Sequence, residues 1–288
     1  MQYQVGGHFF TLCIPPGMIP EDGLVPYLPF QVDENGASAS LFTLSFVKEK
    51  TLLPTETELI ASFTDDEGIT TKLFHAPGGT LFHFALPERE TCCRLYITNS
   101  HRQGTACLDG ECFERKFGFN TCLMILYASA SATSDTLLIH ASAIIHGGKC
   151  HLFLGKSGTG KSTHSRLWLQ HIAGSTLLND DNPVIRIVNG EIWVFGTPWS
   201  GKTPCYNNRC MPLGSIVKLV QAPHNHISRL SLASAYAALL PSCSRMKWIH
   251  TIAEATHRTM EKIITGVPVF KLECLPNRAA ARLCADTV

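Results

Sequence analysis

The residue types that chemistry requires are concentrated in the segment 155–162, whose sequence is GKSGTGKS. It satisfies the pattern G-x-x-x-x-G-K-S/T in full, between a stretch that predicts a strand and one that predicts a helix. Glycines let the chain curl so that backbone N–H groups point at phosphate oxygens, and the dipole of the following helix adds attraction. The sequence therefore predicts a phosphate-binding loop made by Gly155, Lys156, Ser157, Gly158, Thr159, Gly160, Lys161, Ser162 and Thr163.

Two side chains of this loop have specific expected roles. Lys161 should reach the β- and γ-phosphates of a nucleotide, and Ser162 should offer its hydroxyl to a Mg²⁺ ion that bridges those phosphates. The sequence therefore predicts ATP and Mg²⁺ as cofactors. The alternative, a glycine-rich turn that arose by chance, is disfavoured because the strand and the helix are both in place.

Adjacent carboxylates follow the loop at short range. Asp180 and Asp181 come one helix and one return strand after Lys161, so they should lie at the end of a strand beside the loop. Neighbouring side chains on an extended chain point in opposite directions, so one aspartate can serve the metal while the other faces the acceptor or holds a metal-bound water. The sequence does not decide which aspartate does which. An ordinary Asp-Asp-Asn-Pro turn is the alternative.

A histidine and a loop lysine complete the candidate catalytic set. His140 ends an apolar segment predicted to run antiparallel to the strand before the loop, which would bring its imidazole near the γ-phosphate or the metal. Residues 196–202 combine flexible, rigid and cationic residues, so Lys202 is a candidate for contact with transferred phosphate, with Arg209 as a second. A structural histidine and a plain surface turn are the alternatives.

The placement of these residues depends on an alternation of strands and helices. Residues 137–145 predict one strand, Gly147-Gly148 a hairpin turn, and residues 150–154 the returning strand that enters the loop. A helix over residues 162–172 and a short strand over residues 176–178 should follow. The remaining predicted elements are strands at 184–188, 192–195, 216–220 and 269–272 and helices at 232–240, 248–264 and 277–284.

The first part of the chain predicts a different architecture. Up to about residue 116, short apolar runs alternate with turn signals such as Asn35-Gly36, and no segment keeps a helical period for long. A buried helix over residues 120–132 should lead into the second lobe. We therefore predict a β-rich lobe over residues 1–116, without evident chemistry, and an α/β nucleotide-binding domain with a mixed sheet over residues 117–288.

Composition and charge exclude several other classes of protein. Among 288 residues, 24 are Lys or Arg and 23 are Asp or Glu, so no basic field would attract nucleic acid or anionic lipid. No apolar run approaches the roughly 20 residues that cross a bilayer, and the first residues lack the pattern of a secretion signal. We expect a cytoplasmic protein whose 12 cysteines are free thiols, since no paired C-x-x-C motif favours zinc.

Taken together, His140, the segment 155–162 and the pair Asp180-Asp181 resemble the HPr kinase/phosphorylase family and, more distantly, the ATP-dependent phosphoenolpyruvate carboxykinases. The likeness covers roughly residues 137–220. It is nearest to HPr kinase-related proteins of unassigned substrate, in which a segment like residues 153–163 is typical. Residues 196–199 also resemble a segment of these proteins. The resemblance implies an α/β domain with a mixed sheet, of the P-loop type shared by HPr kinases and these carboxykinases.

The resemblance also implies a phosphoryl-transfer enzyme in which His140 and the two aspartates manage metal and proton, with one aspartate as the base toward a hydroxyl. The glutamate-containing signature that follows the aspartates in HPr kinases is not recognisable around residues 208–214, which argues against HPr itself as the substrate. The arginine-rich substrate pocket of a carboxykinase is not evident either, and the first lobe matches neither group.

The sequence thus predicts an ATP- and Mg²⁺-dependent kinase that phosphorylates a hydroxyl of a protein, a peptide or a small molecule. Two alternatives stay open: an ATP-binding sensor or scaffold without turnover, and a phosphoenolpyruvate carboxykinase-like enzyme. The expected partners are ATP and a phosphoacceptor, with neither nucleic acid nor a membrane. The sequence leaves homo-oligomer formation open.

Overall fold

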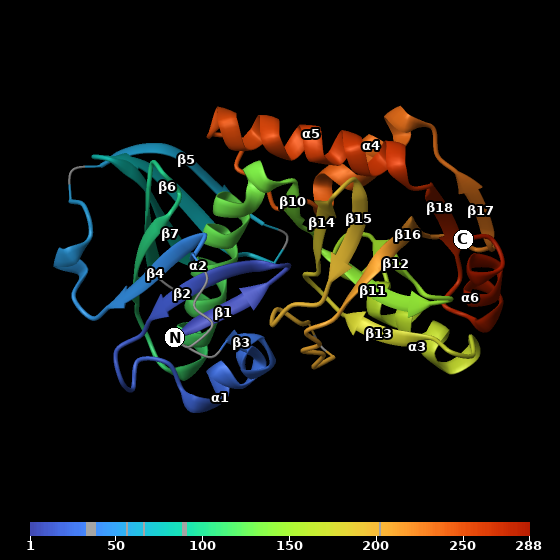
Figure 1. Cartoon of the computed structure of the whole chain (residues 1–288), viewed down its shortest axis with the longest axis horizontal. Coiled ribbons are helices and arrows are strands. Elements are labelled where there is room, and N and C mark those ends of the chain that lie inside the picture. The colour runs from blue at the N-terminus through green and yellow to red at the C-terminus, as the bar shows by residue number, and fades with distance from the viewer. Residues whose placement is uncertain (33–38, 56, 66, 88–90, 202) are drawn as a thin grey trace. The chain divides into compact units, whose positions relative to one another are not determined.

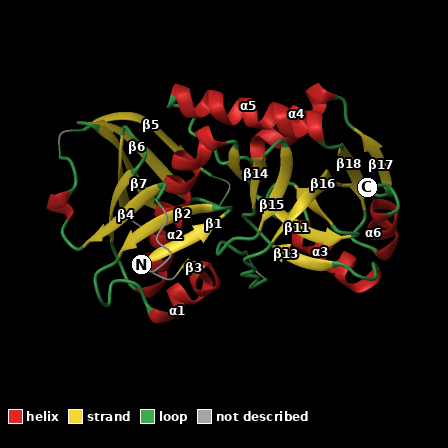
Figure 2. Cartoon of the chain, in the orientation of Figure 1, coloured by secondary structure: helices red, strands yellow, loops and turns green. Residues whose placement is uncertain are grey.

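A computed structural model describes residues 1–32, 39–55, 57–65, 67–87, 91–201 and 203–288. Contacts between residues divide the chain into two compact units, Met1–Ala130 and Ser131–Val288. Each unit contains a mixed β-sheet with helices packed on it, so the chain is a mixed α/β protein (Figures 1 and 2).

The first unit consists of one mixed sheet and one long helix, α2 (Cys112–Ser131), with the shorter helical segments α1 (Glu21–Leu24), η1 (Val25–Phe30) and η3 (Lys50–Leu52). Its strands are β1 (Gln2–Val5), β2 (His8–Cys13), β3 (Gln31–Val32), β4 (Phe42–Val47), β5 (Glu58–Thr64), β6 (Thr70–Ala76), β7 (Gly79–Ala85), β8 (Thr91–Thr98) and β9 (Gln103–Leu108). In the described residues they follow the order β3-β1-β2-β4-β9-β8-β7-β6-β5. Only the pairs β2–β4 and β4–β9 are parallel among these strands.

Helix α2 packs on this sheet through buried aromatic side chains. Phe119 contacts Phe46 of β4, and Tyr127 contacts Phe10 of β2. Gly118 lets the helix approach β8, since a Cβ atom there would lie 2.8 Å from the Cβ of Cys93. Helix α2 begins at Cys112 rather than at residue 120, so the boundary predicted between residues 116 and 117 falls inside it. Its contacts up to Ala130 group it with the first unit, not with the second as expected.

The second unit carries the candidate residues of the site that the structure describes. Its strands are β10 (Thr136–Leu138), β11 (Ala141–His146), β12 (Lys149–Leu154), β13 (Thr176–Asn179), β14 (Val184–Val188), β15 (Glu191–Phe195), β16 (Cys210–Gln221), β17 (His226–Arg229) and β18 (Val269–Cys274). Its helices are α3 (Lys161–His171), α4 (Leu232–Leu239), α5 (His250–Gly266) and α6 (Arg278–Ala285), with the 3₁₀ segments η4 (Ala132–Ser134) and η5 (Leu240–Ser242).

The long strand β16 joins two parts of the second sheet. Its first residues pair antiparallel with β15, and its later residues pair parallel with β12 on one side and with β18 on the other. The described strands follow the order β10-β14-β15-β16-β12-β11-β13, with β18 also beside β16 and β17 beside β18. Strand β12, which enters the glycine-rich loop, is therefore an interior strand with paired neighbours on both sides.

Helices cover both faces of this sheet. Alternate residues of an interior strand point to opposite faces. Leu152 of β12 belongs to the core that includes α4 and α5, whereas the next residue, Phe153, packs with Trp168 of α3 and with α6 (Figure 1). All three side chains are fully buried. Helix α3 is thereby packed against the strand that precedes the loop.

The segment 137–145 forms two strands instead of one. Strand β10 pairs with β14, whereas β11 pairs with β12. Between them Ile139 forms a bridge with Cys243, and the His140 N–H donates to the Ser242 carbonyl at 2.7 Å. The prediction of one strand over residues 137–145 was wrong because apolar periodicity does not show which neighbour a buried strand pairs with. His140 lies at the break, directly before β11.

The other elements predicted in this unit are confirmed, with ends shifted by a few residues. Gly147 and Gly148 form the hairpin turn between β11 and β12, with φ of 56° and 75°. The first half of β16 and all of β17 were not predicted. Strand β17 has the sequence HISR, in which a single apolar residue gives no periodic signal.

Two further properties concern the described chain as a whole. Among the described residues, no helix combines the length and the apolar character that crossing a lipid bilayer would need. The 12 cysteines carry free thiols.

Truncation of a core residue in β12 should destabilise the chain. Leu152→Ala leaves a cavity under the strand that enters the loop, which should lower the free energy of unfolding by about 2–5 kcal/mol. The same change at Leu169, which is 42% exposed on α3, should lower it by less than about 0.5 kcal/mol. Denaturant unfolding followed by circular dichroism measures both, and equal losses for the two variants would contradict this packing.

Two buried histidines beside Trp168 should make stability depend on pH. Burial lowers the pKa of His151 and of His164 to about 4, from the ordinary value of 6.5. Between these values the unfolded chain binds protons that the folded chain does not. The contribution of these two neutral imidazoles to the free energy of unfolding should therefore be fully present above about pH 6.5, and it should decrease as the pH is lowered toward 4.

The variant His164→Gln tests this dependence. It removes one of the two imidazoles that bind a proton on unfolding. The dependence of the unfolding free energy on pH between 6.5 and 4 should therefore become shallower by up to about 1.4 kcal/mol per pH unit. His250→Gln, at an exposed position of α5, is the matched control and should leave the slope as it is. An unchanged slope for His164→Gln would show that this imidazole does not titrate as inferred.

Candidate active site

Three neighbouring strands bring the candidate residues to one edge of the sheet. Strands β12 and β13 both pair antiparallel with β11, so their C-terminal ends lie beside the start of β11. Leu154, the last residue of β12, pairs with Ala141, whose N–H donates to the Asp181 carbonyl at 2.8 Å. Because neighbouring strands are about 4.8 Å apart, the segments that follow β12 and β13 begin roughly 10 Å from each other.

Residues 155–160 form the curled loop that joins β12 to α3. Gly158 and Gly160 have φ of 78° and 111°, which side chains other than hydrogen rarely allow. Gly160 is also the N-cap residue of α3, which begins at Lys161, one residue before the predicted start. Ser162 is half-buried in the first turn, and Thr163 is exposed. The predicted order of strand, glycine-rich loop and helix is present.

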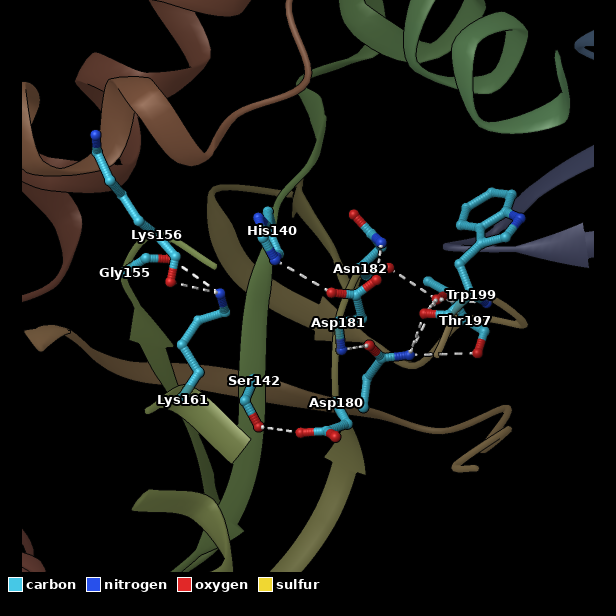
Figure 3. Close-up of polar contacts among 11 residues, drawn as sticks. His140, Ser142, Gly155, Lys156, Lys161, Asp180, Asp181, Asn182, Thr197 and Trp199 are labelled. Atoms are coloured by element: carbon cyan, nitrogen blue, oxygen red, sulfur yellow. Dashed lines mark hydrogen bonds and ion pairs between the residues drawn. The ribbon is translucent and has the colours of Figure 1, made fainter. Parts of the chain in front are cut away.

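The Lys161 side chain folds back over this loop. It is 8% exposed, and its Nζ donates to the carbonyls of Gly155 and Lys156 at 2.9 and 3.5 Å (Figure 3). Lys156 itself is exposed. The ammonium group is therefore held at the loop by neutral carbonyl dipoles, within reach of an anion that binds there.

Asp180 is buried on the side of α3. Its Oδ1 accepts from the Ser142 hydroxyl at 3.0 Å, and the Ser142 and Ser165 hydroxyls are 2.6 Å apart. Ser165 lies one helical turn after Lys161, so the two share a face of α3. The second oxygen, Oδ2, is buried and has no hydrogen-bond partner among the described residues. A buried carboxylate oxygen is costly unless it is paired, so Oδ2 is suited to a cation.

Asp181 points to different partners. Its Oδ1 lies 3.2 Å from Nε2 of His140, and its Oδ2 accepts from the Asn182 side-chain amide at 2.7 Å (Figure 3). The side chains of Asp181 and His140 are 34% and 43% exposed, whereas Asp180 is almost inaccessible. The two adjacent aspartates thus diverge, one into the protein and one toward solvent.

Sequence reasoning missed Asn179, which fixes the backbone at the acidic pair. The residue is fully buried, and its Oδ1 accepts from the Asp181 N–H at 2.9 Å. Its Nδ2 donates to the Thr197 hydroxyl at 3.0 Å and to the carbonyls of Thr197 and Trp199 at 3.3 Å. An asparagine at the end of an apolar strand is no distinctive signal, so only the structure reveals this clamp.

The loop after β15 contributes backbone groups to the site. Thr197 and Trp199 are buried, so a plain surface turn does not describe this part of the loop. Gly196 permits close passage, because a Cβ atom there would lie 2.0 Å from the Asn207 carbonyl oxygen. The predicted Lys202 lies outside the described residues. Arg209 is exposed, and its carbonyl accepts from the Gly196 N–H at 2.9 Å.

The donors at this edge fit a hard cation such as Mg²⁺. The fit rests on the unpaired Oδ2 of Asp180, while Oδ1 of the same carboxylate accepts from Ser142, whose hydroxyl contacts that of Ser165. In the described part of the chain, no three His, Cys, Asp or Glu side chains gather as a metal site. Mg²⁺ commonly takes only one or two carboxylates and completes its shell with phosphate oxygens and water.

Comparison with known proteins finds a distant structural likeness. No protein-family model matches the chain, and no curated sequence compared with it matches either. Among solved structures, the chain is similar to the Hpr(Ser) kinase/phosphatase from Coxiella burnetii, with 14% identity over 52% of this chain and 91% of that chain. The TM-score is 0.31, which does not establish a common fold. Membership of the HPr kinase family stays a prediction.

The Asn179 clamp can be tested by a change that keeps the size of the side chain. Asn179→Asp replaces a donor that serves three acceptors by a carboxylate oxygen, which should cost on the order of 1–3 kcal/mol of unfolding free energy. Asn189→Asp makes the same change at an exposed turn residue and should cost less than about 0.5 kcal/mol. Denaturant midpoints compare the two, and equal midpoints would argue against the clamp.

Proposed function

We propose that the chain is an ATP-dependent phosphotransferase that uses Mg²⁺ and moves the γ-phosphoryl group to a hydroxyl of a protein, a peptide or a small molecule. The observation that carries this proposal is one sheet edge that holds both the glycine-rich loop with Lys161 and the divergent pair Asp180-Asp181. Phosphoryl transfer requires little beyond positioning and charge stabilisation, and this edge offers residues for both.

Phosphate binding would use the loop and the start of α3. Anions bind favourably at helix N-termini, where backbone N–H groups and the helix dipole both attract negative charge. Lys161 would exchange the Gly155 carbonyl for a β- or γ-phosphate oxygen, a stronger partner because it is charged. Little movement would be needed, because the ammonium group already contacts carbonyls of the loop.

Asp180 is our candidate for the metal, with Ser162 as the second protein ligand. The reason is the buried Oδ2 of Asp180, which lacks a hydrogen-bond partner among the described residues and would gain one charged partner. Bound there, Mg²⁺ would neutralise charge on the phosphates and orient them. The network of Ser142 and Ser165 would hold the carboxylate in place while its second oxygen serves the cation.

Asp181 is our candidate for the base, because it is the accessible member of the pair. The acceptor hydroxyl oxygen would form a bond to the γ-phosphorus, and the bond from that phosphorus to the β–γ bridging oxygen would break to release ADP. The hydroxyl proton would pass to the Asp181 carboxylate. His140 and Asn182 would orient this carboxylate through the contacts that they make with its two oxygens.

Separate aspartate variants distinguish these roles. Asp181→Asn should lower transfer about 10²- to 10⁴-fold while ATP affinity stays within a few fold, because a general base acts mainly on the chemical step. Asp180→Asn should weaken binding of Mg²⁺-ATP as well as transfer. Asp286→Asn, at an exposed position in the last turn of the chain, is the matched control and should change neither.

Binding of ATP by titration, and transfer of labelled phosphate to an extract of candidate acceptors, measure the two effects. An ATP-binding sensor without turnover would bind ATP and show no transfer in the unsubstituted chain. Absence of both binding and transfer, with Mg²⁺ present, would reject the proposal.

A further inference from the structure

A pocket of about 640 Å³ adjoins the glycine-rich loop. Its volume lies within the range of about 300–1,000 Å³ that small-molecule sites occupy. The loop and α3 form one wall, and the C-terminal ends of β16 and β18 form the other. The residues that line it are Gly158, Thr159, Gly160, Thr163, His164, Leu167, Leu219, Gln221, Ala222, Cys274, Leu275 and Pro276.

Sheet topology sets where this pocket lies relative to the acidic pair. Strands β16 and β18 run parallel to β12, so their C-terminal ends reach the same sheet edge as the loop. In the strand order, β16 and β18 lie on one side of β12, whereas β11 and β13 lie on the other. The pocket and the pair Asp180-Asp181 therefore flank the loop on opposite sides. A nucleotide whose phosphates occupy the loop would extend one of its ends toward the pocket and the other toward the pair Asp180-Asp181.

The lining of the pocket suits a flat, largely apolar ring with a polar edge. Leu167, Leu219 and Leu275 supply apolar walls, and apolar surface predominates in small-molecule sites with a few polar groups for orientation. Gln221 places a polar group beside the loop, because its Nε2 donates to the carbonyls of Gly158 and Thr159 at 3.3 and 3.4 Å. It is exposed, so a ligand can reach it.

We propose that this pocket binds the base of the nucleotide and that Gln221 favours adenine over guanine. This inference rests on the proposed function, because it takes the phosphates to lie in the loop. A carboxamide presents a donor beside an acceptor, which matches N7 and N6–H of adenine, whereas the same edge of guanine presents two acceptors, N7 and O6. The other edge of guanine includes adjacent N–H donors, which a carboxylate serves best, and no Asp or Glu is among the residues that line the pocket.

Competition binding to the full chain tests the pocket with three probes: ATP, GTP and inorganic tripolyphosphate. We expect ATP to bind at least about tenfold more tightly than tripolyphosphate, since only ATP fills the pocket. Ala222→Phe places a ring in the pocket and should remove that advantage while tripolyphosphate affinity stays within about threefold. Ala233→Phe, exposed on α4, is the matched control and should leave all three affinities unchanged.

Gln221→Glu tests the choice of base without filling the pocket. The ratio of ATP affinity to GTP affinity should fall about tenfold, and the ratio cancels any effect on the phosphates that both nucleotides share. The residue is exposed at the end of β16, so this variant adds no bulk to the pocket, unlike Ala222→Phe.

The outcomes separate the two proposals. Equal affinity for ATP and tripolyphosphate, unaffected by Ala222→Phe, would overturn the base pocket and leave the phosphate site intact. An ATP to GTP ratio that Gln221→Glu does not move would overturn the role of Gln221. If neither ATP nor tripolyphosphate binds the unsubstituted chain, the phosphate site fails and this inference fails with it.

Discussion

The hydrogen-bonded ladder of β13, β11 and β12 is the constraint on which the site depends. Buried strands must pair their backbone groups, and a slip of one residue in this ladder would turn every side chain to the other face. The ends of β12 and β13 are therefore fixed two strand spacings apart, with the start of β11 between them. The glycine-rich loop directly follows β12, the two aspartates follow β13, and His140 directly precedes β11. The sheet therefore sets the distances between these groups.

Charge is held at this edge mainly by neutral dipoles in the contacts described above. Lys161 is bound by carbonyl groups of the loop, and Asp180 accepts from a serine hydroxyl. Burial of either charge without polar partners would cost several kcal/mol. Partners that are neutral keep each charge oriented but leave its field available to a ligand, which is the condition for electrostatic preorganisation. The solvent-facing pair of Asp181 and His140 differs, because its two members face each other.

Local patterns in the sequence predicted the parts of the site that depend on neighbours along the chain. The loop pattern located β12 and α3, and the alternation of side chains anticipated that Asp180 and Asp181 diverge. The break at His140 could not be predicted, because both β10 and β11 are buried and apolar and differ only in the strands that pair with them. The true start of helix α2, eight residues before the predicted one, was also missed. Gly118 and the charged residues of its first turns obscure the apolar period there.

Contacts between distant segments account for what sequence patterns could not supply. The Asn179 clamp joins the end of β13 to the loop after β15, and the pocket beside the loop draws its walls from α3, β16 and β18. Gln221 and Gly158 are far apart along the chain, and only the parallel pairing of β12 with β16 brings them together. Parallel neighbours carry no local signature, since each requires a long crossover connection. Residues such as Gln221 and Asn179 therefore acquire their roles from the topology of the sheet.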